Sequence, residues 1–93
     1  MGIAQVTNYP NPFKDSTEFI FNLDEDSEIV IKLYTLSGRL VRELMPGMLG
    51  SGYREVDWDG KDSAGNELSS GVYYYKIIIN NSGEKLGKLA IIR

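Results

Sequence analysis

The chain of 93 residues contains neither cysteine nor histidine. Without cysteine there can be no disulfide, thiol nucleophile or thiolate metal site. Without histidine, Ser-His-Asp and Cys-His catalysis and most zinc geometries are excluded. No apolar run approaches the ~18–20 residues that a membrane-spanning helix requires. The first residues also lack the charged-then-apolar pattern of a secretory signal segment.

What is present describes an ordinary globular domain. At 42% hydrophobic and 25% charged residues, the composition is not that of a disordered chain. The length suits one domain with a modest core, and Met1-Gly2 is typical of an added start, so we expect residues 1–93 to be a single domain cut from a longer protein. The net charge of −3, with ten scattered basic residues, argues against a nucleic-acid partner.

Apolar and polar residues alternate with a period of two through most of the chain, which predicts β-strands. Phe19, Phe21 and Leu23 share one face of their segment, and Val56 and Trp58 are expected in the core. Strands are expected over 17–23, 28–36, 39–44, 52–58, 71–79 and 85–92, with a seventh near 3–7.

Turn residues separate these segments. Gly38 predicts a tight hairpin between 28–36 and 39–44, and 80–84 predicts a second one. One proline and three glycines within 45–52 exclude a strand interior there. A helix over 36–45 fits the apolar spacing but would be under ten residues long, so a strand is preferred.

Strands about ten residues apart predict an all-β fold, an Ig/fibronectin-like antiparallel β-sandwich of about seven strands. A single sheet of this size would leave one apolar face in water, whereas two packed sheets bury both. Trp58, Tyr73 and Tyr75 are expected to supply much of the central packing.

The acidic stretch 57–68 is similar in composition to a calcium loop. In either register of an EF-hand, however, Lys61 or Asp62 occupies a position that the pattern reserves for an oxygen ligand or glycine. A looser set of oxygens remains, from Asp59, Asp62, Asn66 and Glu67. The preferred interpretation is that the two aspartates bond loop amides while neighbouring glycines adopt positive φ, with no metal bound.

Strand alternation divides the tyrosine run, placing Tyr73 and Tyr75 inside and Tyr74 outside. Tyr74, with Ile78 and Tyr34, is a candidate exposed contact for a partner. A chain this small has no room for a cleft between two catalytic carboxylates, so we expect no enzymatic activity and no cofactor.

The segment "NYPNPF" (8–13) contains two X-Pro steps, which favour extended backbone and disfavour a helix. We expect Tyr9 and Phe13 to lie along the sandwich and clamp the start of the following strand.

Four stretches, in chain order, resemble a known family: "NYPNPFKDST", "IKLYTLSGRLVREL", "WDGKDSAGNELSSGVYYYKI" and "KLAIIR". Together they resemble the C-terminal sorting domains of the bacterial type IX (Por) secretion system. The related Ig-like domain of the flagellar hook-capping protein family is similar in the same places. The most specific positions are Trp58-Asp59-Gly60, Gly65 and Ser70-Gly71-Val72-Tyr73.

The resemblance implies a non-catalytic sorting domain at the C-terminus of an exported protein, with Arg93 as the natural end. The outer-membrane secretion machinery would recognise it, and an upstream cargo domain would be covalently attached. The protein would cross the periplasm and reach the cell surface or exterior as a monomer. The family's recognition strand corresponds to Lys88, Leu89, Ala90, Ile91, Ile92 and Arg93.

A second function stays open. The chain could be a passive Ig-like accessory or spacer module of an extracellular hydrolase, with carbohydrate bound at an exposed aromatic pair. Tyr34 and Tyr74 are the only candidates for that pair.

Overall fold

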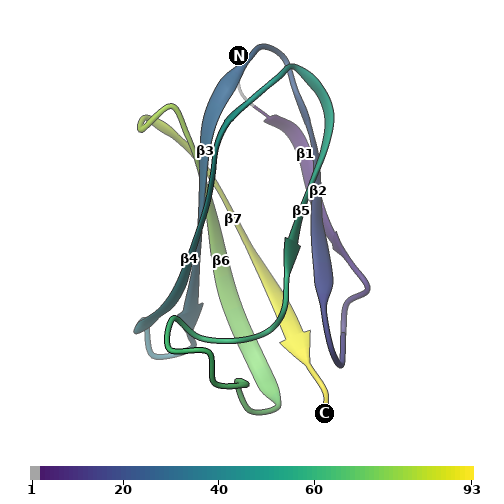
Figure 1. Ribbon diagram of the computed structural model, residues 1–93, viewed down its shortest axis with the longest axis vertical. Helices are drawn as coiled ribbons and strands as arrows, with labels where there is room; N and C mark the ends of the chain where they lie inside the picture. Colours follow the sequence, from purple (N-terminus) through teal and green to yellow (C-terminus); the bar gives the residue numbers. More distant parts are fainter. Residues whose placement is uncertain (1–2) are drawn as a thin grey trace.

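The computed structural model describes residues 3–93, with side chains from Val6 onward, and that range contains seven strands and no helix (Figure 1). The strands are β1 (Ile3–Tyr9), β2 (Thr17–Leu23), β3 (Ser27–Thr35), β4 (Leu40–Leu49), β5 (Gly52–Trp58), β6 (Gly71–Ile79) and β7 (Gly83–Ile91). Within the described residues, nothing has the helical length and apolarity needed to span a membrane.

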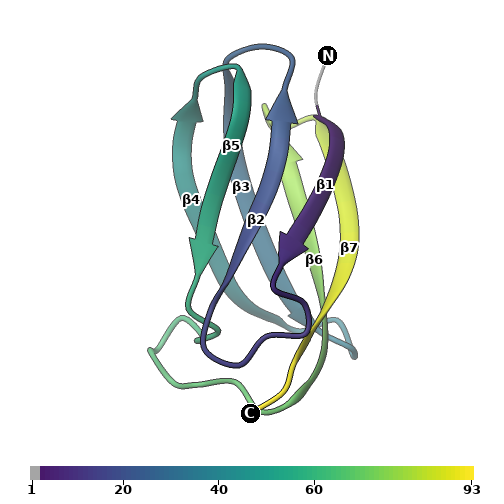
Figure 2. The same ribbon diagram turned by 90° about the vertical axis from the view of Figure 1, so that its right-hand side faces the viewer.

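All strand pairs are antiparallel, and they form two sheets. The first sheet has the order β1-β2-β5, and the second has the order β4-β3-β6-β7. The sheets pack face to face, so the Ig/fibronectin-like sandwich predicted from the alternation is confirmed (Figure 2).

The core consists of the inward faces of both sheets. Phe19 and Tyr75 meet edge to face across the two sheets, with ring centroids 5.0 Å apart. Trp58 makes a similar contact with Phe13 at 5.7 Å. Such aromatic pairs contribute about 0.5–1.5 kcal/mol beyond simple burial. The predicted core faces are confirmed, although Val56 is only partly buried.

Strand β4 is longer than the sequence predicted, because it continues through Pro46 and Gly47 to Leu49. The register with β3 shifts between Ile29 and Ile31, so Met45 and Pro46 form a bulge opposite one residue. β4 is also an edge strand, and proline, which lacks an N–H, is found in sheets mainly at edge strands and bulges. The prediction that 45–52 excludes a strand was therefore wrong.

Both hairpins form where the sequence predicted them. Gly38 adopts a φ of 92° in the β3–β4 turn, and its N–H donates to the Thr35 carbonyl at 2.9 Å. In the β6–β7 turn, Asn80 and Asn81 rather than glycine adopt positive φ, at 53° and 60°. Ile79 pairs with Gly83, so the turn contains three residues, and its two consecutive positive φ values match the right-handed strand twist.

The segment between β1 and β2 runs along the end of β7. The Phe13 N–H donates to the Ala90 carbonyl at 3.0 Å, and the Ile92 N–H donates to the Phe13 carbonyl at 2.8 Å. Phe13 is 2% exposed, whereas Tyr9 is 71% exposed. The predicted clamp therefore consists of Phe13, and the expectation that Tyr9 lies along the sandwich was wrong.

Candidate functional site

The acidic stretch folds as a loop whose carboxylates bond its own main chain. Asp59 Oδ1 accepts hydrogen bonds from the Lys61 N–H at 3.1 Å and from Arg42 Nη1 at 3.0 Å. Partial desolvation raises the pKa of Asp59, but the Lys61 amide and the Arg42 guanidinium outweigh it and leave the pKa below its ordinary value. The carboxylate is thus stabilised by protein donors.

Asp62 serves the same purpose further along the loop. Its Oδ1 accepts hydrogen bonds from the N–H groups of Ala64 at 3.0 Å and Asn66 at 2.9 Å. Gly60 and Gly65 adopt φ values of 72° and 88°. The interpretation that the two aspartates bond loop amides is therefore confirmed.

Among the described residues, no three Asp or Glu side chains lie in an arrangement that could hold a metal ion. That the looser set of Asp59, Asp62, Asn66 and Glu67 binds no calcium stays a prediction. We expect equal melting temperatures with calcium and with magnesium.

Trp58 anchors this loop to the core. The ring is 1% exposed, and its Nε1 donates to the Lys61 carbonyl at 3.1 Å. Arg42 from β4 donates to the same carbonyl at 2.8 Å. The Trp58-Asp59-Gly60 signature therefore fixes the start of a long connection between the two sheets.

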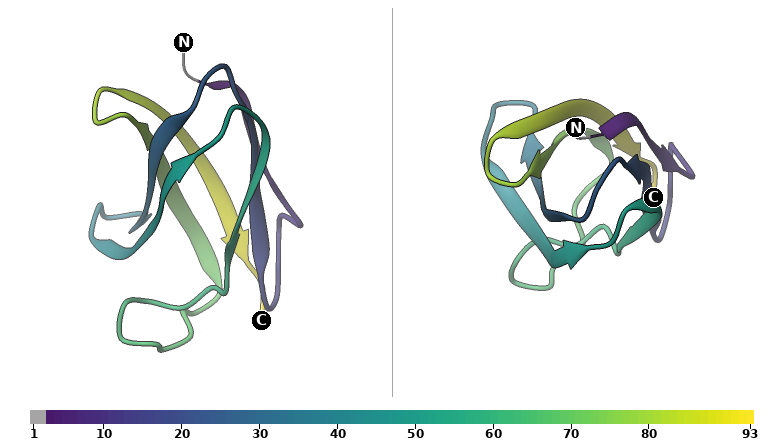
Figure 3. Two further views of the ribbon diagram at one scale, coloured as in Figure 1. Left: turned by 45° about the horizontal axis from the view of Figure 1, so that its top comes forward. Right: turned by 90° about the horizontal axis from the view of Figure 1, so that it is seen from above.

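Arg93 closes that connection at the end of the sandwich that also carries the C-terminus (Figure 3). Its guanidinium donates to three main-chain carbonyls, those of Leu68 at 2.6 Å, Lys14 at 2.9 Å and Gly60 at 3.0 Å. The Arg93 N–H also donates to Ser70 Oγ at 2.9 Å. This side chain, expected to face a receptor, is bound to the domain's own loops.

The other residues of the predicted recognition strand divide by alternation. Leu89 and Ile91 are buried in the core at 2% and 1% exposure. Lys88 and Ile92 are exposed, and Ala90 is partly covered by the Asn11–Phe13 segment. Of the six residues, only Lys88 and Ile92 therefore present exposed side chains that are not bonded to the domain's own loops.

Tyr34 and Tyr74 are brought together as predicted. They lie directly opposite each other on β3 and β6, on the outer face of the four-stranded sheet. Tyr74 is 42% exposed and Tyr34 is half-buried. The Lys76 ammonium lies 5.7 Å from the centre of the Tyr34 ring, within cation–π range.

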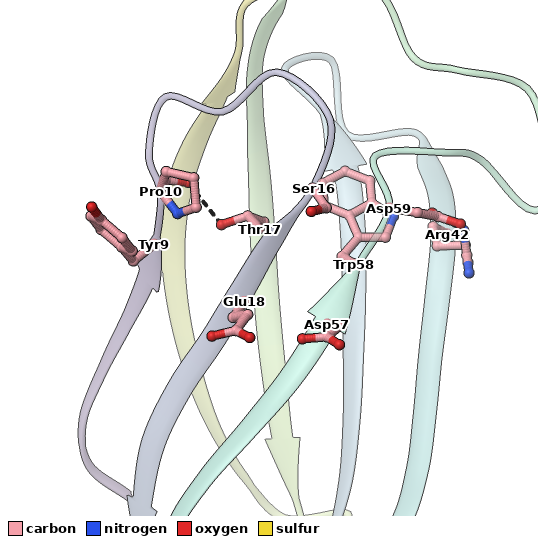
Figure 4. Close-up of a pocket in the computed structure, with 9 residues that line it drawn as sticks. All are labelled: Tyr9, Pro10, Ser16, Thr17, Glu18, Arg42, Asp57, Trp58 and Asp59. Carbon is pink, nitrogen blue, oxygen red and sulfur yellow. Dashed lines mark hydrogen bonds and ion pairs between the residues drawn. The ribbon is translucent and has the colours of Figure 1, made fainter.

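A depression of about 560 Å³ on the other sheet was not predicted from the sequence. Figure 4 shows Glu18 of β2 and Asp57 of β5 pointing toward each other there. The nearby Glu55 carboxylate, partial desolvation and Asp57 together raise the pKa of Glu18. The acidic residues were visible in the sequence, but their proximity depends on the β2–β5 register, which pairs Glu18 with Asp57.

The chain was compared with known proteins. A family model described as the FlgD Ig-like domain matches residues 8–83. The sandwich is similar to dimeric latent PorU from Porphyromonas gingivalis, with a TM-score of 0.78 and 25% identity over 94% of this chain. It is also similar to PorZ, an essential bacterial surface component of the type-IX secretion system of the same organism, with a TM-score of 0.66 and 27% identity over 95%.

A third similar structure is FlgD from P. aeruginosa, with a TM-score of 0.66 and 28% identity over 82% of this chain. The chain spans only 9% of the PorU chain, 11% of the PorZ chain and 58% of the FlgD chain. A comparison with curated protein sequences found no match.

Proposed function

The chain belongs to the FlgD Ig-like domain family, and we propose that it is a non-catalytic sorting domain that directs an exported bacterial protein through type IX secretion. In this proposal the domain forms the C-terminal part of its protein and is covalently joined to an upstream cargo. It passes through the periplasm, is recognised at the outer membrane, and reaches the cell surface or the exterior with its cargo.

The observation that carries the proposal is the extent of the similarity to PorZ. The match covers 95% of the chain, which leaves fewer residues unmatched than the nine that β7 contains. The FlgD family model instead ends at residue 83, where β7 begins. The similarity to a type-IX secretion component therefore extends into the strand that the sorting function would use.

The packing of β7 determines how this proposal can be tested. Deleting residues 88–93 would remove the buried side chains of Leu89 and Ile91 together with the bonds of Arg93. Each buried apolar side chain contributes several kcal/mol, so the truncated domain would unfold. Lost export would then say nothing about recognition. Substitution of the exposed residues Lys88 and Ile92 avoids this problem.

The experiment uses a reporter carrying an export signal, fused upstream of the chain in a bacterium with type IX secretion. The intact domain should bring the reporter to the cell surface, where added protease degrades it. The double variant Lys88→Glu, Ile92→Ser should reduce surface reporter about tenfold, the effect of losing ~1.4 kcal/mol of recognition energy. A reporter that stays in the periplasm with the intact domain would contradict the sorting function.

A matched control comes from the β3–β4 turn. Leu36 and Ile92 are both 59% exposed, and Arg39 is an exposed cation like Lys88. The variant Arg39→Glu, Leu36→Ser thus makes the same chemical change elsewhere on the surface. It should leave export at the level of the unchanged domain.

The Tyr34–Tyr74 pair favours a second candidate function, carbohydrate binding by an accessory module. Two adjacent aromatic rings with Lys76 beside them offer a surface on which sugar rings can stack. A glycan array should then show binding that Tyr74→Ala abolishes and that Tyr53→Ala, on the other sheet, does not. No binding in such an array would remove this candidate.

A further inference from the structure

The outer edge of β7 changes character along its length. At its C-terminal end, the Ala90 N–H donates to Asn11 Oδ1 at 3.0 Å, and its carbonyl accepts from the Phe13 N–H. Because main-chain groups alternate in direction along a strand, those of Lys88, Leu86 and Glu84 point to the same side. Within the described part of the chain, β7 forms a ladder only with β6; β1, at the edge of the other sheet, passes near β7 but does not pair with it (Figure 2).

The opposite edge of the same sheet is protected against strand addition. On β4, Pro46 has no N–H to offer, and a bulge interrupts the strand at this point. The Ser63 N–H covers the Val41 carbonyl at 3.0 Å. By contrast, β7 contains no proline, and its register with β6 is unbroken from Gly83 to Ile91. The β7 edge thus lacks the proline and the bulge that interrupt the opposite edge.

A side chain of the core reaches this edge. The Tyr75 ring passes beside Gly87 so closely that a Cβ atom at Gly87 would collide with the Tyr75 hydroxyl. Tyr75 is 6% exposed, and its hydroxyl bonds to no other side chain or main-chain group among the described residues. Burial raises the pKa of Tyr75, so the hydroxyl keeps its proton at neutral pH. It is therefore a donor located beside the open main-chain groups.

The side chains along the edge define the chemistry of a partner. Leu86 is 72% exposed on the outer face. Glu84 forms an ion pair with Lys76 at 3.5 Å, whereas Lys85 and Lys88 form none within the described part of the chain. The edge thus combines an exposed apolar side chain with uncompensated positive charge, which favours an extended segment with apolar and acidic residues.

We propose that the Glu84–Lys88 edge of β7 binds an extended acidic segment of a partner protein as an additional strand of the four-stranded sheet. The inference rests on the proposed sorting function and assigns its recognition step to main-chain pairing. The added strand would continue the edge that Asn11–Phe13 already covers at Ile91. It would accept a hydrogen bond from the Tyr75 hydroxyl and place apolar and acidic side chains beside Leu86 and Lys88.

The test uses proline to remove one outward-facing N–H. Leu86→Pro deletes a donor that β6 does not use, because the β6-facing bonds of β7 belong to the odd-numbered residues on either side. Leu86→Ala is the matched control, since it removes the same side chain and keeps the N–H. Both variants are compared in the reporter fusion after thermal melting has verified that each domain is folded.

We expect Leu86→Pro to reduce surface reporter about tenfold relative to Leu86→Ala, through the lost hydrogen bond and the steric bulk of the ring. If the unchanged domain exports the reporter and Leu86→Pro does so equally well, strand addition is overturned while the sorting function stands. If the unchanged domain exports nothing, the sorting function itself fails.

Two further measurements keep the inference testable if Leu86→Pro unfolds. Lys88→Glu should reduce export, whereas Lys14→Glu, at an exposed lysine outside the edge, should not. Equal export by the two charge variants would overturn the acidic partner. In sedimentation velocity the isolated domain should be a monomer, and a dimer would overturn the acidic partner in favour of a second copy of the chain.

Discussion

At the residue scale, Arg93 joins segments that are far apart in the sequence. Its guanidinium bonds the Lys14 carbonyl before β2 and the Gly60 and Leu68 carbonyls between β5 and β6. A planar guanidinium can reach several carbonyls at once, which a lysine ammonium cannot do with the same geometry. The side chain thus stabilises the loops at this end of the sandwich.

We expect Arg93→Ala to destabilise the domain by roughly 1–3 kcal/mol, because three carbonyls lose a charged donor. Thermal melting measures the loss, and hydrogen exchange should show faster exchange of amides in the 59–70 loop. Arg93→Lys should recover only part of the stability.

Arg39 provides the control for this prediction. It is an exposed arginine in the β3–β4 turn, so Arg39→Ala should change stability by less than about 0.5 kcal/mol. Equal stability of Arg93→Ala and Arg39→Ala would contradict the role assigned to Arg93.

Removing the charge of Glu18 should stabilise the domain, in contrast to the loss of stability expected for Arg93→Ala. Its pKa is raised in the folded protein, so the folded state binds this proton more tightly than the unfolded chain. The ionised group therefore destabilises the fold at neutral pH, and this effect disappears as the pH falls through the raised value and below the ordinary value of 4.5.

Glu18→Gln should accordingly raise the melting temperature slightly at pH 7. The gain should disappear below about pH 4, where the glutamate is protonated in both states. Glu25→Gln, in the bend at the opposite end of β2, is the control for removing one negative charge. A gain from Glu18→Gln that persisted at low pH would show that repulsion among the carboxylates is not its cause.

At the element scale, alternation predicted the strands well because each has one buried face. Phe19, Phe21 and Leu23 illustrate this, since each is at most 2% exposed. Alternation did not predict the continuation of β4 after Leu44. There β4 is an edge strand with a bulge, so the regular pairing with β3 is interrupted and a proline is tolerated. The helix considered over 36–45 does not form, because the chain from Leu40 onward is strand β4, which pairs with β3.

The segment between β1 and β2 yields a prediction at this scale. Phe13→Ala should cost about 3–5 kcal/mol, because it removes a buried ring that contacts Trp58 at the point where the segment pairs with β7. Tyr9→Ala, at the exposed aromatic residue of the same motif, should cost less than about 0.5 kcal/mol. Chemical denaturation compares the two variants, and a similar cost for both would contradict Phe13 as the clamp.

At the scale of the whole molecule, the sequence predicted the sandwich more fully than its surface. Tyr34 and Tyr74 meet as expected because alternation specifies the outer face. The open part of the β7 edge depends on which residues Asn11–Phe13 covers, and the bonds of Arg93 depend on how two distant loops meet. Such features require knowledge of tertiary contacts. Gly87 within a strand was the one local signal of a close approach.

Sorting must also be distinguished from transport of any Ig-like domain. P. aeruginosa FlgD shares the sandwich with 28% identity over 82% of this chain. Its matching domain therefore provides a fused partner of the same architecture with a different surface. Replacement by this domain separates the effect of the fold from the effect of this chain's own residues.

The most direct measurement is the fraction of reporter that protease reaches on intact cells with type IX secretion, for this chain against the matching FlgD domain. The account predicts that most of the reporter fused to this chain is degraded by the protease, while the reporter fused to the FlgD domain stays protected. Equal protection of the two fusions would contradict the account.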